Sequence, residues 1–111
     1  MKALVPFGVT MAFLIGAHFA LAQQGDAKAG TAVYNKSCAT CHAADGAPKE
    51  AIAKMLKVEI PHLGAAEVQA KSDADLKKVI TEGYEKMKPV KGLADKDVAN
   101  VIAFMRTLKK S

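Results

Sequence analysis

The pentapeptide Cys38-Ala39-Thr40-Cys41-His42 is the most informative stretch of this 111-residue chain for its fold. Two thiols three positions apart, followed at once by a histidine, form the attachment signature of a c-type haem. Each thiol can add to one vinyl group of the porphyrin, and the adjacent imidazole is then held beneath the iron as an axial ligand. The chain has no other cysteine. The spacing therefore predicts one covalent haem c, attached through Cys38 and Cys41 and ligated by His42.

Three other uses of the two cysteines are open at the level of sequence. A disulfide between them would close a very small loop and contribute little stability. A thioredoxin-type redox pair sits where a strand enters a helix, and the chain shows no such pattern. A tetrahedral zinc site needs about four nitrogen or sulfur ligands, which would bring in His62, twenty residues beyond His42. The spacing favours haem attachment over all three.

The N-terminus has the layout of a secretory signal peptide. Lys2 precedes an uncharged apolar run that ends in Ala20-Leu21-Ala22, a small-x-small cleavage site. We therefore expect residues 1–22 to be a signal peptide, residues 23–111 to form one mature domain, and the mature protein to be periplasmic. The alternative is a retained anchor, because the run approaches the roughly 20 residues that span a bilayer. Export agrees with thioether-linked haem, which is normally installed outside the cytoplasm.

Composition limits the size of the domain and its partners. Removing residues 1–22 leaves 111 − 22 = 89 residues, enough for one small domain. Lys2 is removed with them, so the mature balance is 15 basic minus 11 acidic residues, or +4. The absence of tryptophan limits the core, and a buried porphyrin would supply the missing apolar surface. The modest charge, the expected export and the lack of a binding motif argue against nucleic acid as a partner.

Helical periodicity covers most of the mature chain, and no segment has a convincing strand pattern. Asp26 and Ser72 are the expected N-caps of two helices, and Gly83 falls where a C-terminal cap belongs. In the second expected helix, Ile52, Met55 and Leu56 share an apolar face. The helices that we expect run from Asp26 to Ser37, from Pro48 to Lys57, from Ser72 to Gly83 and from Asp95 to about Leu108.

Several side chains are candidates for the sixth position on the iron. Met105 lies on the apolar face of the last helix and Met55 on that of a shorter one, so both are expected to point into the core. Met87 lies in an irregular polar segment between two lysines, where no core role accounts for it. We therefore predict that Met87 is the distal thioether ligand and that His62 is an ordinary loop histidine.

These features together resemble a class I monohaem cytochrome c, and they are most similar to the small bacterial branch near the cytochrome c6 and c551/c552-like proteins. The resemblance covers essentially all of the mature chain. The Cys-x-x-Cys-His motif is its most specific part. The other residues that carry it are Gly30, Tyr34, Met87, Pro89, Val101 and Phe104.

The resemblance implies an all-α small cytochrome c fold, with about four short helices wrapped around one covalently bound haem. It assigns His42 as the proximal ligand and Met87 as the distal ligand. It also implies that the first and last helices cross, with Gly30 and Tyr34 against Val101 and Phe104. In the family a backbone carbonyl in the loop after the motif, often that of a proline, orients the proximal imidazole, and both Pro48 and Pro61 qualify by type.

The function that the resemblance implies is that of a soluble one-electron carrier and not an enzyme. A thioether ligand raises the reduction potential, and two protein ligands leave oxygen or peroxide no vacant coordination position. Redox partner proteins, an electron donor and an acceptor, are the expected partners, and lysines such as Lys86 and Lys88 would face an acidic patch on one of them. Stable membrane insertion after processing is not expected. The alternatives are a haem enzyme or sensor with a labile sixth ligand, and a membrane-tethered module or a subunit of a larger respiratory complex.

Overall fold

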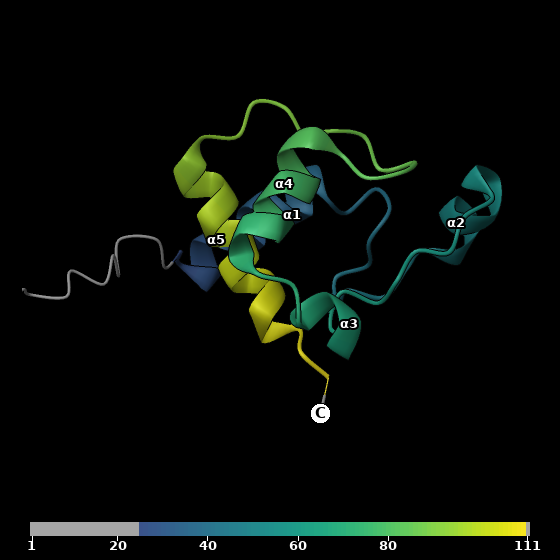
Figure 1. Cartoon of the computed structure of the whole chain (residues 1–111), viewed down its shortest axis with the longest axis horizontal. Helices are drawn as coiled ribbons and strands as arrows, with labels where there is room; N and C mark the ends of the chain where they lie inside the picture. Colours follow the sequence, from purple (N-terminus) through teal and green to yellow (C-terminus); the bar gives the residue numbers. More distant parts are fainter. Residues whose placement is uncertain (1–24, 111) are drawn as a thin grey trace, which may run out of the picture.

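Five helices lie between residues 25 and 110, the part of the chain that the computed structural model describes (Figure 1). Within this range the only β pairings are two isolated bridges, so the predicted all-α class is confirmed. Each helix in the range is too short or too polar to traverse a bilayer. The signal peptide predicted for residues 1–22 lies outside the described residues. The helices are α1 (Ala27–Ser37), α2 (Glu50–Leu56), α3 (Ala66–Gln69), α4 (Asp73–Glu82) and α5 (Asp95–Thr107).

The predicted caps set the ends of two helices. Asp26 Oδ1 accepts hydrogen bonds from two backbone N–H groups in the first turn of α1, at 2.9 and 3.4 Å. Ser72 Oγ accepts one from the N–H of Asp75 at 3.1 Å and so caps α4. Gly83 ends α4 with a φ of +83°, a backbone conformation that glycine adopts most easily. The Asp26 and Ser72 side chains satisfy backbone groups that a helix end leaves without partners.

The pair α1 and α5 forms the central packing of the molecule. Gly30 lies directly against α5, since a Cβ at this position would lie 1.9 Å from the carbonyl oxygen of Asn100. Tyr34, one turn later, is fully buried, and its ring centroid lies 4.8 Å from that of Phe104. Val101 is fully buried in the same core. The predicted crossing of these helices is confirmed.

The apolar core extends from this crossing toward α3 and α4. Met105 belongs to it, as predicted from the last helix. The helix α3 was not predicted, because one turn is too short to show a period, yet it contributes a buried valine. The buried apolar residues are Tyr34, Leu63, Val68, Leu76, Ile80, Val98, Val101, Ile102 and Met105.

Polar side chains tie distant segments to α5. Asn100 is buried, and its Oδ1 accepts a hydrogen bond from the N–H of Asp26 at 2.8 Å. Gln69, at the end of α3, donates from Nε2 to the carbonyls of Leu63 and Met105, at 2.9 and 3.0 Å. Because a buried polar group without a partner is costly, these bonds fix the register between the segments they join.

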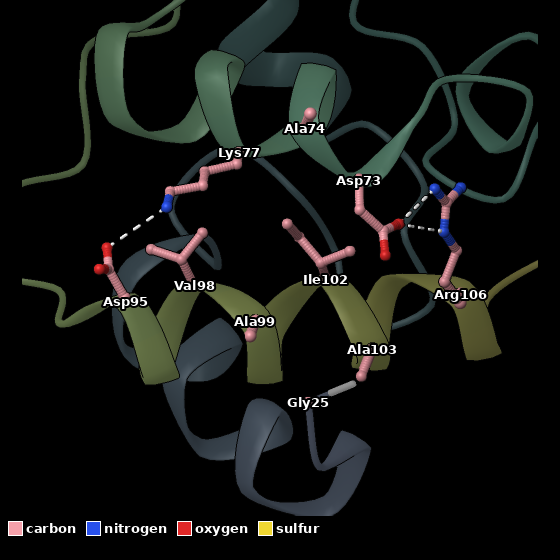
Figure 2. Close-up of a pocket in the computed structure, with 10 residues that line it drawn as sticks. All are labelled: Gly25, Asp73, Ala74, Lys77, Asp95, Val98, Ala99, Ile102, Ala103 and Arg106. Carbon is pink, nitrogen blue, oxygen red and sulfur yellow. Dashed lines mark hydrogen bonds and ion pairs between the residues drawn. The ribbon is translucent and has the colours of Figure 1, made fainter. Parts of the chain in front are cut away.

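Two ion pairs join α4 to the two ends of α5, with an open groove between the helices (Figure 2). Lys77 Nζ lies 3.4 Å from Asp95 Oδ1 at one end. At the other end Arg106 Nη2 lies 2.7 Å from Asp73 Oδ1. Arg106 also donates to the backbone carbonyl of Gln69 at 2.8 Å, so it fastens the chain between α3 and α4 as well.

Helix α2 stands apart from the other helices (Figure 1). None of its residues is buried, and no other helix packs closely against it. Ile52 and Leu56 are half-buried, but Met55 is 69% exposed. The prediction that Met55 turns inward is therefore wrong. The period of the sequence defines one face of this helix, but no other element covers that face at Met55.

Candidate functional site

The cysteine–histidine motif begins at the end of α1 and continues it as one further turn. Cys38 is the C-cap residue, and its N–H donates to the Tyr34 carbonyl at 2.8 Å. The N–H groups of Cys41 and His42 both donate to the Cys38 carbonyl, at 3.3 and 3.1 Å. This turn brings both sulfur atoms and the imidazole onto one short piece of backbone. The two thiols are half-buried and are not joined in a disulfide.

The surroundings of the Cys38 thiol favour its protonated form. Burial raises the pKa of this thiol to about 11. A thioredoxin-type thiol has a lowered pKa instead, so that the reactive thiolate is present at neutral pH. This environment argues against the thioredoxin-type alternative.

His42 carries a buried ring nitrogen that has no partner. Its Nδ1 makes no hydrogen bond, and burial lowers the pKa of the imidazole because desolvation disfavours the charged form. A neutral imidazole is the form that coordinates a metal ion. Since buried polar atoms are rarely left unpaired, this ring fits a site completed by an additional group. The motif as a whole fits a covalent haem, with two free thiols and one neutral imidazole on a single turn.

The loop after His42 folds back on the motif. Two backbone hydrogen bonds of 2.8 and 3.1 Å close an isolated antiparallel bridge that pairs His42 with Pro48. The sequence did not decide whether Pro48 or Pro61 supplies the backbone carbonyl that orients the imidazole. Of the two, Pro48 is the residue whose backbone pairs with that of His42.

Tyr34 reaches the same loop from α1. Its hydroxyl group donates a hydrogen bond of 2.6 Å to the carbonyl of Ala43, the residue that follows His42. Sequence reasoning assigned Tyr34 to helix packing alone and missed this contact. The available signal was its position one helical turn before Cys38, which places it on the side of α1 from which the motif continues.

Met87 lies in a tight turn of the segment that follows α4. Tyr84 and Met87 exchange both of their backbone hydrogen bonds, at 3.0 and 2.9 Å. Glu85, between them, has a φ of +52°. The side chain of Met87 is half-buried and lies outside the apolar core. The turn gives Met87 a defined backbone position, and its role as a ligand stays a prediction.

His62 is a loop histidine, as predicted. Its Nδ1 accepts a hydrogen bond of 2.9 Å from the N–H of Gly64. Among residues 25–110 there is no group of three or more His, Cys, Asp or Glu side chains arranged to hold a metal ion. The groove of Figure 2 is also separate from the motif, since neither the two cysteines nor His42 nor Met87 lines it.

Comparisons with known proteins agree with the chemistry of the motif. Residues 25–105 match the model of the family described as cytochrome c oxidase, cbb3-type, subunit III. A solved structure described as the KustC0563 c-type cytochrome has a TM-score of 0.64 to this chain and 32% sequence identity, covering 73% of this chain and 98% of that chain. No curated protein matches this chain.

Proposed function

Since this chain belongs to the cbb3-type subunit III family of cytochrome c domains and is a class I-like monohaem cytochrome c, we propose that it is a periplasmic one-electron carrier. In this proposal Cys38 and Cys41 hold the haem covalently, and His42 and Met87 are the axial ligands. The observation that carries it is the turn after α1. There, two free thiols stand beside an imidazole whose buried Nδ1 has no partner.

The side chains of this chain determine which chemistry is available. A c-type haem supplies a one-electron iron couple when bound, with a potential set by its axial ligands and by burial. His42 would provide a neutral nitrogen, and Met87 a soft thioether that favours the ferrous state. With both axial positions taken by protein side chains, no position is left for a substrate, which supports electron transfer over catalysis. Redox proteins are the partners that this function requires.

A second candidate function follows from the description of the family. The family is described as a subunit of an oxidase, which favours a tethered module or a subunit of a larger respiratory complex. Mass spectrometry of the N-terminus of the native protein separates the two. Loss of residues 1–22 from a protein purified without detergent supports the soluble carrier, whereas their retention in a protein that requires detergent supports the tethered form.

The ligand assignment is tested by Met87→Ala, with Met55→Ala as the matched control. Loss of the thioether should lower the reduction potential by on the order of 0.1 V, within the ~0.8 V range that axial ligands span. It should also abolish the far-red sulfur-to-iron band of the ferric spectrum and admit external ligands. Met55 is 69% exposed, so its replacement should change neither quantity. A Met87→Ala protein with the wild-type band and potential would contradict the assignment.

The attachment is tested by replacing both cysteines with alanine. Haem in the wild type should stay with the polypeptide through acidified-acetone extraction, because two thioether bonds hold it. The Cys38→Ala/Cys41→Ala protein should release any haem that it carries. Haem that remains covalently bound to this double variant would overturn the attachment.

A further inference from the structure

The backbone carbonyl of Ala43 accepts two hydrogen bonds. One comes from the Tyr34 hydroxyl group at 2.6 Å, and the other comes from the N–H of Gly46 at 2.9 Å. Ala43 directly follows His42, so this carbonyl belongs to the peptide group between Ala43 and Ala44, one residue beyond the residue that carries the imidazole. The contact joins the helix before the motif to the loop after it.

Tyr34 is itself held rigidly. It has no solvent-exposed surface, and its ring packs against Phe104 of α5 with a centroid separation of 4.8 Å and an interplanar angle of 55°. Burial raises the pKa of Tyr34 to about 12, so the hydroxyl group keeps its proton and stays a donor. Helices α1 and α5 therefore fix the position of the Tyr34 hydroxyl oxygen, and the loop after His42 is positioned by its hydrogen bond to this oxygen.

Helix packing does not account for the hydroxyl group. A phenylalanine would fill the same space without burying a polar atom, which costs free energy unless it is hydrogen-bonded. The hydroxyl group is also not required to satisfy the Ala43 carbonyl, because this carbonyl already accepts a hydrogen bond from the N–H of Gly46. What the hydroxyl group adds is a second, directional link between the α1–α5 pair and the backbone next to His42.

From this geometry we infer that Tyr34 is a positioning residue for the proximal ligand, holding the His42 backbone in place by fixing the carbonyl of Ala43. The inference rests on the proposed function, in which His42 is an axial ligand. Groups that orient a metal ligand without touching the metal influence its donor strength, and a ligand on a rigid support keeps its geometry. Tyr34 would give the imidazole such a support in both oxidation states.

The test is Tyr34→Phe in the haem-loaded protein, with Thr31→Ala as the matched control. Thr31 lies on the same helix, and its hydroxyl group also donates to a backbone carbonyl, that of Ala27 at 3.1 Å. Residue-resolved amide exchange is measured by NMR on the reduced protein. In Tyr34→Phe the amides of Ala43 and Gly46 should exchange roughly 2- to 12-fold faster, which is what loss of one hydrogen bond corresponds to. Exchange should speed up less in α1 and α5 than in the loop, and the reduction potential should shift.

The control and the wild type separate the possible outcomes. Thr31→Ala should leave both the loop and the potential unchanged. If Tyr34→Phe speeds exchange equally in α1, α5 and the loop at an unchanged potential, Tyr34 only fills space and the inference is overturned, while the carrier proposal stands. If the wild type lacks the thioether band, the proposed function fails before any variant is made.

A second measurement covers the case in which Tyr34→Phe does not accumulate as a loaded protein. The hydroxyl proton of Tyr34 should be visible by NMR in the reduced wild type, because a buried hydrogen bond slows its exchange with water. A proton that exchanges rapidly with water would overturn the link to Ala43.

Discussion

Tyr34 shows at the scale of one residue how burial couples this fold to pH. Burial, the largest cause, raises the pKa of Tyr34 from 10.0 to about 12, with smaller contributions from Cys38 and Asp45. The folded state therefore favours the protonated phenol more strongly than the unfolded state does. The corresponding stability is complete below the unfolded pKa of 10.0 and is lost as the pH rises through about 12.

We predict that Tyr34→Phe removes this loss of stability at alkaline pH. The difference in unfolding free energy between the wild type and Tyr34→Phe should be constant from pH 7 to about pH 9, since the phenol of residue 34 is protonated in both states there. It should shrink between about pH 10 and pH 12, where only the wild type loses stability through this group. Denaturant unfolding at a series of pH values measures the difference. A difference that stays flat up to pH 12 would contradict the burial of the hydroxyl group.

At the scale of helices, the close approach of α1 and α5 depends on Gly30. Alanine in a helix is more favourable than glycine by about 1 kcal/mol, so Gly30→Ala would stabilise an isolated helix. Here the new Cβ would lie 1.9 Å from the backbone oxygen of Asn100, which cannot rotate away. Overpacking typically costs about 1–3 kcal/mol, which the helix preference for alanine partly offsets. We therefore predict a net loss of up to about 2 kcal/mol, measured by thermal or denaturant unfolding.

Gly92 provides the contrasting control for that substitution. A Cβ there would meet nothing within 4 Å, but the residue has a φ of +80°. Gly92→Ala should therefore lose only the backbone preference, and it should leave the contact between the rings of Tyr34 and Phe104 intact. Gly30→Ala should weaken that contact, which near-ultraviolet circular dichroism can follow. If Gly30→Ala leaves the aromatic signal unchanged, the proposed tight crossing is wrong.

Arg106 attaches the segment between α3 and α4 to helix α5. Its hydrogen bonds to backbone carbonyls contribute more to this attachment than its ion pair does. Asp73 is 68% exposed, and exposed ion pairs are typically worth about 0–1 kcal/mol, so Asp73→Asn should change stability little. Arg106→Met also removes the donors to the carbonyls of Gln69 and Lys71, at 2.8 and 2.7 Å. We predict a loss of about 1.5–3 kcal/mol for Arg106→Met, as expected for charge-assisted hydrogen bonds. Equal losses in the two variants would assign the effect to the ion pair.

The same contacts show what local sequence signals can predict. The caps at Asp26 and Ser72 act within three residues, so the sequence predicts them correctly. The bond from Asp26 to Asn100 spans 74 positions and has no local signature. Met55 was misplaced for a related reason, because the period of α2 marks an apolar face without saying what covers it. The cysteine–histidine motif is the exception, since covalent chemistry fixes its spacing in the sequence itself.

At the scale of the whole molecule, the apolar core is confined to one side of the described chain. It draws on α1, α3, α4, α5 and Leu63, while α2 contributes no buried residue. Small domains with so little core usually depend on a cofactor or a crosslink. We predict that the haem-free chain lacks a cooperative thermal transition and has reduced helicity by far-ultraviolet circular dichroism. A cooperative transition at the midpoint of the haem-loaded protein would show that the polypeptide core suffices.

Charge placement is the second property of the whole molecule, and it determines how electron-transfer partners approach. Lys86 and Lys88 are exposed on either side of Met87. If electrons leave near this turn, local positive charge should raise the encounter rate with an anion and lower it with a cation, and salt should screen both effects. Lys109 and Lys110 are also exposed, but they lie at the C-terminal end, away from the segment after α4 (Figure 1).

Ferricyanide and hexaammineruthenium are suitable anionic and cationic probes of this placement. Reversing Lys86 and Lys88 to glutamate should slow electron exchange with ferricyanide about 10-fold at low ionic strength, at the lower end of the known range of steering effects. Exchange with hexaammineruthenium should become faster. Lys109→Glu/Lys110→Glu changes the net charge by the same amount but at a different place, so it should have a much smaller effect on both rates, measured by stopped flow against salt concentration. Equal effects of the two double variants would mean that the overall charge of the protein governs the encounter, and the turn around Met87 would then have no special part in electron exit.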